Sequence, residues 1–401
     1  MTIYEQLGVP RIINACGTVT RLGGAPMPAA VLDAYVEAAG HWVSLEQLQA
    51  AASKRIAGHM GTEAALVTSG AAAALTLAAA AIMTEHDLGR MERLPQTSGY
   101  ANEFIMAREQ RSGYDHAVRA AGATLVEVGF NEIVSNAGVR RTETWEYEAA
   151  IGERTAGILY CFSRHSAPPL NEVIEMARGH SLPVIVDAAG ELPPRSNLRD
   201  IPASGADLVA FSGGKAIRGP QSTGVLCGRR RWISAAALQM LDMDDHFQLW
   251  DPPAELIDRE KLTGHPRHGI GRGLKVSKEE IVALLVALDL FAGGAYDCER
   301  VEQRERLQTI VDQLQKTTIE CQIRDTEDGE SWPTLELAVP QRDPQAAFEL
   351  CRQLRNGTPP IYVGHGRLNE GILVVNPLCI DRDDARVVAD QIVAIQSLVD
   401  S

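Results

Sequence analysis

The sequence predicts an α/β protein with a large domain built on a mostly parallel, seven-stranded sheet and a small C-terminal α/β domain. A length of 401 residues exceeds the needs of one small core, and the apolar share of 45% is ordinary for a globular chain. Between about residues 63 and 228, short apolar runs alternate with Ala- and Leu-rich helical stretches, which is typical of a parallel sheet covered on both faces. We expect an N-terminal arm and helix over 1–60, the large domain over 61–290 and the small domain over 291–401.

The expected elements follow this plan along the chain. A short apolar strand at 12–18 runs into a polar turn, and a helix is expected at 45–60. The seven strands of the large sheet are expected at 65–67, 103–107, 124–128, 156–162, 184–187, 208–212 and 223–227, with helices at 114–121 and 170–180. Residues 229–275 have the composition of a loop-rich connection. The remainder is expected to contain helices at 277–293, 297–316 and 383–399 and strands at 334–339 and 372–375.

Charge and composition argue against two classes of partner. A net charge of −14 opposes nucleic-acid binding, which needs clustered Lys and Arg side chains. The one dense basic run, 229–231, is interpreted as a solvated turn after a strand. The weakly polar stretch 64–83 is long enough to suggest a membrane span, but Ser69 and Gly70 interrupt it, so a strand end, a turn and a buried helix are expected instead. We therefore expect neither a nucleic-acid nor a membrane partner.

The cysteines and histidines predict no metal site and no disulfides. Seven cysteines are an odd number, and they form neither a CxxC nor any pair with zinc-ligand spacing. The ten histidines do not pair with Cys or Asp at metal spacing. The first ten residues lack the basic and apolar regions of a secretory signal. Reduced thiols and a cytoplasmic location are therefore expected.

A carboxylate stands at the carboxyl end of the expected strand 184–187. Taken alone, Asp187 is more often a helix N-cap. The functional alternative is a charge pair with the pyridine nitrogen of pyridoxal phosphate (PLP), which would keep the ring able to accept electrons from a substrate carbanion.

A lysine lies in a glycine-rich turn after the next expected strand, in the sequence Ser212-Gly213-Gly214-Lys215. Most lysines are ordinary surface residues. In this turn, however, small neighbours would let a bulky ring approach the backbone, and a neutral amine can form an imine with an aldehyde cofactor. Lys215 follows Asp187 by 28 residues (215 − 187), enough for one helix and one strand, so both could lie on neighbouring strand ends.

A third strand end leads into a helix through Ser69-Gly70-Ala71. The plain interpretation is an ordinary N-cap, but free N–H groups at a helix start also attract phosphate. His116 and His165 each follow an expected strand. A lone histidine is more often a surface or capping residue, so these two remain candidates only.

The order of these motifs resembles that of fold-type I, aspartate aminotransferase-like PLP enzymes. Within them it is similar to the bacterial selenocysteine synthase group, most closely to its D-glucosaminate-6-phosphate ammonia-lyase branch. The matching segments are 13–18, 67–71, 183–189, 212–215 with 219–220, and 271–276. The resemblance covers most of residues 3–290 and weakens over the last hundred.

The resemblance implies a cofactor site. Lys215 would form a Schiff base with PLP, and Asp187 would pair with the pyridine nitrogen. The phosphate would be held by Ser69, Gly70, Ala71 and Ser212. Arg272 and Lys275 would lie near a subunit boundary, since these enzymes build active sites between two protomers, which implies a homodimer or a higher homo-oligomer.

The resemblance also implies substrate-facing residues. Asn14, Thr18 and Arg21 would approach the substrate from the N-terminal arm. The segment 111–116, with Tyr114 and His116, would lie over or beside the ring, and His165 is a further candidate. The family's Arg-Thr pair in a small-domain strand is replaced here by 374–378. Arg367 and Arg218 are therefore two hypotheses for binding the substrate carboxylate.

The predicted function is a PLP-dependent lyase that eliminates water and ammonia from a β-hydroxy amino acid or an amino-sugar acid to give a 2-keto acid. Racemisation, aldol cleavage or β-replacement would use the same lysine and aspartate, because fold does not fix function. A seryl-tRNA selenium transferase is less favoured. That enzyme carries an extra N-terminal domain for tRNA, whereas the shared motif begins here by residue 12. A PLP-free binding protein is the least favoured alternative.

Overall fold

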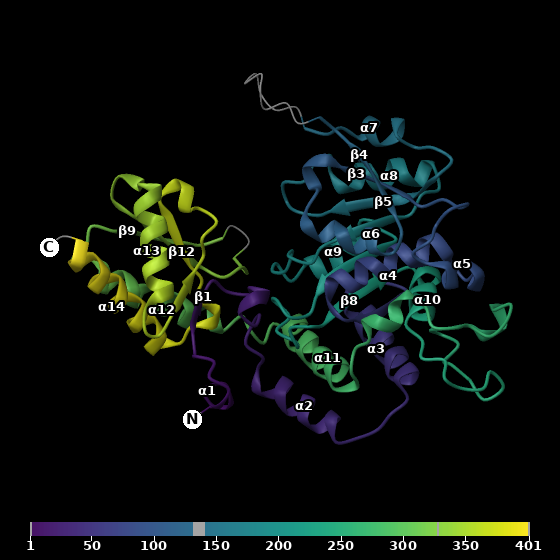
Figure 1. The fold of residues 1–401 in the computed structure, drawn as a ribbon, viewed down its shortest axis with the longest axis horizontal. Helices are drawn as coiled ribbons and strands as arrows, with labels where there is room; N and C mark the ends of the chain where they lie inside the picture. The colour runs from purple at the N-terminus through teal and green to yellow at the C-terminus, as the bar shows by residue number, and fades with distance from the viewer. Residues whose placement is uncertain (1, 131–140, 327–328, 400–401) are drawn as a thin grey trace. The chain divides into compact units, whose positions relative to one another are not determined.

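A computed structural model describes residues 2–130, 141–326 and 329–399. The chain forms two compact units, one of residues 27–292 and one that joins residues 1–26 to 293–401. Figure 1 traces both units from the N-terminus to the C-terminus.

The large unit contains a seven-stranded sheet. Its strands, in spatial order, are β2 (Ala64–Thr68), β8 (Gly224–Gly228), β7 (Leu208–Ser212), β6 (Val184–Asp187), β5 (Thr155–Cys161), β3 (Glu103–Ala107) and β4 (Thr124–Val128). The five strands from β7 to β4 are parallel to one another, and β8 runs antiparallel to both β7 and β2. The carboxyl ends of β2, β5, β6 and β7 consequently lie along one edge, together with the start of β8.

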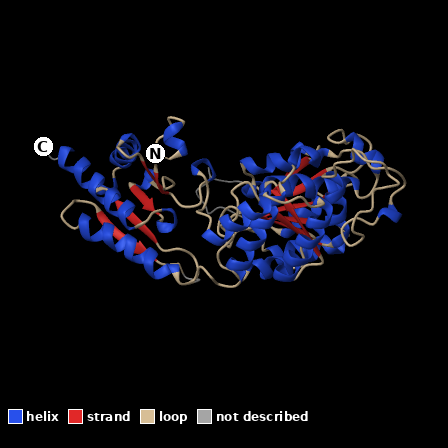
Figure 2. Cartoon of the chain, turned by 90° about the horizontal axis from the view of Figure 1, so that it is seen from below, coloured by secondary structure: helices blue, strands red, loops and turns tan. Residues whose placement is uncertain are grey.

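Helices cover both faces of this sheet (Figure 2). They are α2 (Ala29–Ala39), α3 (Leu45–Met60), α4 (Gly70–Thr84), α5 (Leu88–Arg93), α6 (His116–Ala120), α7 (Thr144–Ala149), α8 (Leu170–Gly179), α9 (Asn197–Ala203), α10 (Arg230–Gln239) and α11 (Lys278–Ala292). The alanine-rich α4 is buried over almost its whole length and packs across β8, β7 and β6. Small side chains allow this close approach, which places the start of α4 beside the strand ends.

The second unit contains a three-stranded antiparallel sheet in the order β12 (Ile372–Val375), β10 (Thr334–Ala338) and β9 (Glu320–Arg324). A separate pair is formed by β1 (Ile13–Ala15) and β11 (Ile361–Val363), which run parallel. The helices of this unit are α1 (Ile3–Gln6), α12 (Glu299–Leu314), α13 (Pro344–Asn356) and α14 (Arg382–Val399). Apolar residues of β1, β10, β11, β12, α12, α13 and α14 form one continuous core.

The observed units divide the chain differently from the expected boundaries at residues 60 and 290. The arm up to residue 26 belongs with the C-terminal unit because β1 pairs with β11. Helix α3 belongs with the large unit because it packs against β2.

Two sequence-based interpretations were wrong. Residues 229–275 are not wholly a loop-rich connection, because α10 occupies 230–239 and is largely buried. The basic run at 229–231 is exposed, as expected, but it is not a turn: Arg229 is the N-cap of α10, and the next two arginines lie in its first turn, where the Arg231 guanidinium stacks 4.1 Å from the Trp232 ring centroid. Within the described residues, no helix is long and apolar enough to cross a membrane.

Candidate active site

Three of the motifs identified in the sequence lie at one edge of the large sheet. Thr68, the last residue of β2, is paired with Gly224, the first residue of β8. Gly224 is also paired with Ser212, the last residue of β7. The Ser69–Ala71 turn and the Ser212–Lys215 turn therefore start from neighbouring positions, and Asp187 ends β6, the strand on the other side of β7.

Backbone hydrogen bonds shape the turn that carries Lys215. The N–H of Gly213 donates to the Thr223 carbonyl over 2.9 Å, and the N–H of Gly219 donates to the Gly213 carbonyl over 2.9 Å. The turn closes where the N–H of Arg218 donates to the Lys215 carbonyl over 3.0 Å. A Cβ at Gly214 would lie 2.5 Å from the Gln221 Cα, so glycine is needed there. The half-buried side chain of Lys215 is thus held on a tightly packed loop.

Asp187 is held at the end of β6, between Cys161 on β5 and Ala210 on β7. Its Oδ1 accepts a hydrogen bond from the N–H of Ala189 over 3.0 Å. Burial raises the pKa of the Asp187 carboxyl, while that hydrogen bond and the charge of Lys215 act in the opposite direction. A cationic ring nitrogen beside this carboxyl would favour its ionised form.

Gly190 and Glu191 also belong to this region, although the sequence reasoning did not single them out. A Cβ at Gly190 would lie 3.8 Å from Lys215 Nζ, so the amine lies next to a residue that has no side chain. Glu191 is partly buried. Burial raises the pKa of the Glu191 carboxyl, the charge of Asp187 adds to this effect, and the charge of Lys215 opposes it. The sequence signal for this residue is a second carboxylate four residues after Asp187, which the sequence analysis did not use.

The start of α4 provides a phosphate-sized group of donors. Ser69 occupies the N-cap position, yet its Oγ makes no capping bond and instead donates to the Leu274 carbonyl over 3.0 Å. Gly70 has φ +87°, a backbone conformation that favours glycine. The first N–H groups of a helix have no intrahelical partners and carry a partial positive charge. Ser69, Gly70 and Ala71 are therefore suited to an anion.

Arg272 lies in the short 3-10 helix η5 (Ile270–Leu274), in the same segment as the Leu274 carbonyl that accepts from Ser69. Its Nη2 donates to Asp242 over 2.5 Å, but its buried Nε has no hydrogen-bond partner among the described residues. Arg272 and the exposed Lys275 line a cavity of about 800 Å³, together with apolar residues of α3 and α10 and the side chain of Trp250.

Tyr114 and His116 lie at the surface of the large unit. Tyr114 is 69% exposed, and His116 begins α6 with its Nδ1 3.5 Å from Arg119 Nη2. The buried residue of this segment is Asp115, which forms ion pairs with both Arg111 and Arg119. The side chain of Asp115 therefore fixes the segment, and it was not among the predicted site residues.

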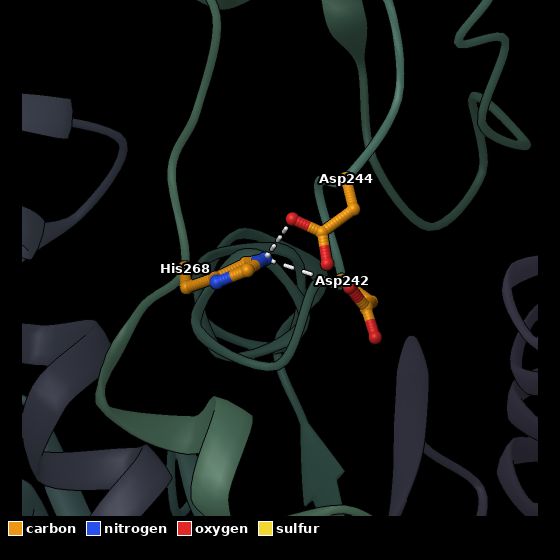
Figure 3. Close-up of side chains that lie close together, drawn as sticks. All are labelled: Asp242, Asp244 and His268. Atoms are coloured by element: carbon orange, nitrogen blue, oxygen red, sulfur yellow. Dashed lines mark ion pairs between the residues drawn. The ribbon is translucent and has the colours of Figure 1, made fainter.

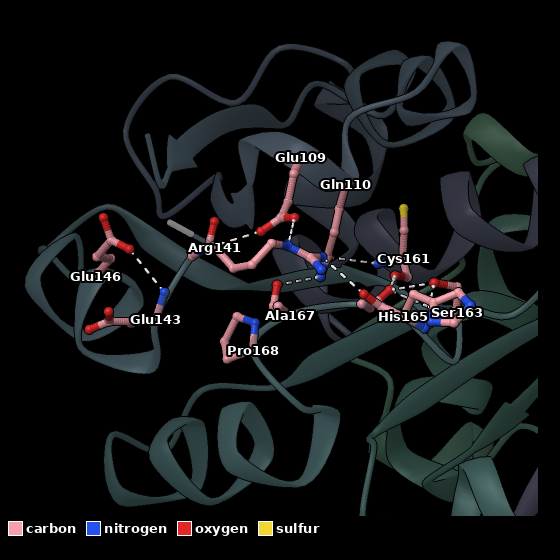
Figure 4. Close-up of polar contacts among 12 residues, drawn as sticks. Glu109, Gln110, Arg141, Glu143, Glu146, Cys161, Ser163, His165, Ala167 and Pro168 are labelled. Atoms are coloured by element: carbon pink, nitrogen blue, oxygen red, sulfur yellow. Dashed lines mark hydrogen bonds and ion pairs between the residues drawn. The ribbon is translucent and has the colours of Figure 1, made fainter. Parts of the chain in front are cut away.

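His165 lies in the turn after β5, and Figure 4 shows its surroundings. Its ring accepts a hydrogen bond from Arg164 Nε over 3.1 Å, and its carbonyl accepts one from Arg141 Nη2 over 2.9 Å. Nearby, the buried side chain of Gln110 accepts from the N–H of Cys161 over 3.1 Å. These contacts connect the turn after β3 to the end of β5, next to Asp187.

Arg218 is buried and has φ +62°. A positive φ is unusual for a side chain of this size, which indicates that the turn after Lys215 constrains it.

The remaining substrate candidates lie in the second unit. The Asn14 side chain is buried, donates to the Gly17 carbonyl over 2.9 Å and accepts from the N–H of Cys16 over 3.0 Å. Thr18 is half-buried, and the exposed Arg21 lies in η1 (Thr20–Leu22). Arg367 forms ion pairs with Glu336 and Glu370, so its charge is already compensated.

One group of metal-ligand types occurs within the described residues. Asp242, Asp244 and His268 bring their ligand atoms within 4.8 Å of one another, and all three residues are exposed (Figure 3). Asp242 is also paired with Arg272. The contacts of His268 Nε2, 3.5 Å to Asp242 and 3.7 Å to Asp244, are those of a surface ion-pair cluster.

The fold and the arrangement of Lys215, Asp187 and the α4 start define the class: this is a fold-type I, PLP-dependent enzyme. Aspartate aminotransferase from Thermus thermophilus shares the fold, with a TM-score of 0.50 at 15% identity over 98% of this chain and 94% of that one. The solved structure of D-glucosaminate-6-phosphate ammonia-lyase is much more similar, with a TM-score of 0.80 at 28% identity over the whole of both chains.

The chain belongs to the SelA family, whose model is described as L-seryl-tRNA selenium transferase and matches residues 12–243. Among curated relatives, D-glucosaminate-6-phosphate ammonia lyase of Salmonella typhimurium is 30% identical over 94% of this chain and 92% of that protein. The 5'-C-glycyluridine monooxygenase-decarboxylase of a Streptomyces species is 31% identical over 95% and 88%, respectively. The predicted family, fold and enzyme class, a PLP-dependent lyase, are confirmed.

Proposed function

We propose that the enzyme eliminates water from a β-hydroxy amino acid or an amino-sugar acid, and that hydrolysis of the resulting enamine releases ammonia and a 2-keto acid. The observation that carries this proposal is the Lys215 amine beside Gly190, on the same sheet edge as the Asp187 carboxyl. It is supported by the likeness to D-glucosaminate-6-phosphate ammonia lyase along nearly the whole chain.

The residues present fit PLP. The start of α4, with Ser69, Gly70 and Ala71, and Ser212 at the end of β7 would hold the phosphate, and Arg272 would contribute from η5. Asp187 would pair with the ring nitrogen, and Lys215 Nζ would hold the cofactor as a Schiff base. When bound, PLP supplies an acceptor for the electron pair released when the Cα–H bond of the substrate breaks.

Lys215 would then act as the base. The Lys215 amine would take the α-proton of the substrate. Gly190 leaves space at that position because it has no side chain, so a substrate with a bulky polyhydroxyl tail could still place its Cα near Nζ.

Glu191 would protonate the leaving hydroxyl. In the substrate, the β-carbon is bonded to the Cα from which Lys215 would take the proton. A group close to Lys215 Nζ would therefore also be close to the Cβ–O bond that breaks. Because burial raises the pKa of Glu191, more of this carboxyl keeps its proton at neutral pH than an exposed glutamate would. The proton would leave with the hydroxyl as water, and the resulting carboxylate would recover a proton from solvent.

Tyr114, His116, His165, Arg218, Asn14, Thr18, Arg21 and Arg367 remain proposals for substrate contacts, as in the sequence analysis. Arg367 is the weakest of these, because two glutamates already neutralise it. We also propose a cytoplasmic homodimer or higher homo-oligomer with active sites at the subunit interface. The strongly exposed side chains of Val36, on α2, and Trp42, which follows α2, support an interface at this part of the large unit.

The test is an absorbance spectrum of the purified protein and of Lys215→Ala, before and after borohydride. A band between about 410 and 430 nm that borohydride abolishes and the variant lacks is expected for an imine on Lys215. An amino-acid and amino-sugar-acid screen for ammonia and 2-keto acid then tests the reaction. A band without elimination from any substrate would favour another PLP reaction on an amino acid, such as racemisation, aldol cleavage or β-replacement.

A further inference from the structure

Two arginines of the second unit converge on one aromatic ring. The Arg21 Cζ lies 5.5 Å from the centroid of the Tyr362 ring, and the Arg355 Cζ lies 5.4 Å from the same centroid. Arg21 comes from η1 in the N-terminal arm, and Arg355 lies in the last turn of α13. Tyr362 is on β11, paired with Asn14 on β1. The β1–β11 pair thus brings together two cations that are 334 residues apart (355 − 21).

The environment of Cys16 locates both cations near one point. Cys16 follows β1 directly, and the charges of Arg21 and Arg355 both act to lower the pKa of its thiol, against burial, which raises that pKa to about 11. Burial likewise raises the pKa of Cys351 on α13, and the charges of the same two arginines and a hydrogen bond from the Arg355 side chain oppose it. Both guanidinium groups are therefore near the half-buried surface formed by Cys16 and Tyr362.

This cation pair lacks the carboxylate partners that most other arginines of the unit have among the described residues. Carboxylates pair with Arg11, Arg300, Arg304, Arg306, Arg324, Arg352, Arg367, Arg382 and Arg386. Within the part of the chain that the structure describes, neither Arg21 nor Arg355 has a carboxylate partner. The Nε of Arg355 is buried without a hydrogen-bond partner, and its Nη2 is 3.5 Å from His365 Nδ1.

Two uncompensated guanidinium groups are unfavourable together, particularly where one N–H has lost its water. An oxyanion would relieve both problems, because a planar guanidinium donates two parallel hydrogen bonds to a carboxylate or a phosphate. We propose that Arg21, Arg355 and Tyr362 form a binding site for a small oxyanion, the carboxylate or phosphate group of an acidic metabolite.

The site would also offer a candidate for binding the substrate carboxylate, a role for which the replaced Arg-Thr pair leaves no residue assigned. Asn376 stands in that segment, its N–H donates to the Ala15 carbonyl over 2.9 Å, and its side chain accepts from the N–H of Leu378 over 3.0 Å. Asn376 carries no charge and is used locally. Arg367 is neutralised by Glu336 and Glu370, whereas Arg355 is not.

The test is a titration of the ¹⁵N-arginine-labelled holoenzyme with inorganic phosphate and with acetate, followed by NMR at the arginine Nε–H signals. The signal that is present in the wild-type spectrum and absent from that of Arg355→Lys is assigned to the Arg355 Nε–H. We expect this signal to shift on titration, and the Kd for the anion to rise about tenfold or more in both variants, read from the Arg21 Nε–H signal in Arg355→Gln and from the Arg355 Nε–H signal in Arg21→Gln. Arg352→Gln, on the same helix but paired with Glu349, is the matched control and should leave the Kd unchanged.

Unchanged affinity for both anions in both variants would overturn the site. Arg355→Lys, which keeps the charge but not the planar fork, should give an intermediate affinity and guards against a folding defect in the glutamine variants. A parallel rise in substrate KM at constant kcat would identify the oxyanion as part of the substrate, whereas an unchanged KM with weakened anion binding would indicate a separate metabolite. The titration does not depend on turnover, so it remains readable if no elimination is found.

Discussion

Gly224, at the start of β8, packs directly against the backbone of Gly70, at the start of α4. A Cβ on Gly224 would lie 2.4 Å from the carbonyl carbon of Gly70 and 2.6 Å from the Ala71 nitrogen. No side chain fits between strand and helix, so the free N–H groups of α4 are held at the sheet edge that carries Lys215.

Gly224→Ala should therefore weaken PLP binding and lower stability. The added methyl must push the start of α4 away, and overpacking of this kind costs about 1–3 kcal/mol of unfolding free energy. Thermal unfolding and a PLP titration of the apo-protein would measure both effects. Gly264→Ala, where a Cβ meets no heavy atom within 4 Å, is the control and should change neither value.

Asp187→Asn should lower activity and raise the stability of the apo-protein. Loss of the charge that supports the ring nitrogen is expected to reduce kcat about a hundredfold or more. Burial raises the pKa of Asp187, so the folded apo-protein holds this proton more tightly than the unfolded chain. The stability of the wild-type apo-protein therefore falls as the pH rises from the pKa of Asp187 in the unfolded chain through its pKa in the folded protein. An asparagine does not titrate, so the variant does not lose this stability. If the apo-form of Asp187→Asn had a lower Tm at pH 7 than the wild-type apo-protein, this account would be contradicted.

Glu191→Gln should slow elimination of a β-hydroxyl by about a hundredfold, the scale of general acid catalysis. A β-chloro substrate should be affected far less, because chloride leaves without a proton. In the wild type, kcat should fall as the pH rises through the raised pKa of Glu191, and the variant should lose this dependence. The exposed Glu175→Gln, on α8, serves as the control. Equal losses with both leaving groups would assign Glu191 a merely structural role.

Asp115→Asn should destabilise the protein at neutral pH. Burial acts to raise the pKa of Asp115, but its bonds to Arg111 and Arg119 outweigh burial and lower the pKa. The stabilisation is thus present above the unfolded pKa and is lost as the pH falls. Denaturant unfolding at pH 7 should show a loss of about 1–3 kcal/mol that shrinks in acid. The exposed Asp200→Asn should show no such loss.

The large sheet was predictable because its strands are short apolar runs bounded by turns. The bounds of β3, β4, β6 and β7 match the expected ranges, and those of β2, β5 and β8 differ by one residue at both ends. The buried α10 was missed because it begins at an exposed basic run, and the residues that are buried start only at Trp232.

The candidate site was predictable only where a motif is local in sequence. Asp187 ends β6, while Ser69 and Lys215 lie in the turns that follow β2 and β7, so their common edge follows from a mostly parallel sheet. Arg355 could not be predicted in this way. Its partners in space, Arg21 and Tyr362, meet it through the pairing of β1 with β11, and nothing in the sequence of either three-residue strand indicates that pairing.

The same β1–β11 pair fixes the order in which the protein can be completed during synthesis. Residues 13–15 leave the ribosome first, but their partner at 361–363 is made only near the end of translation. Residues 27–292 form a contiguous unit that can fold as it emerges. The arm, by contrast, must wait with its apolar strand unpaired, and closing so long a loop is slow. A chain truncated before residue 361 should therefore keep the large unit and expose the arm to proteases.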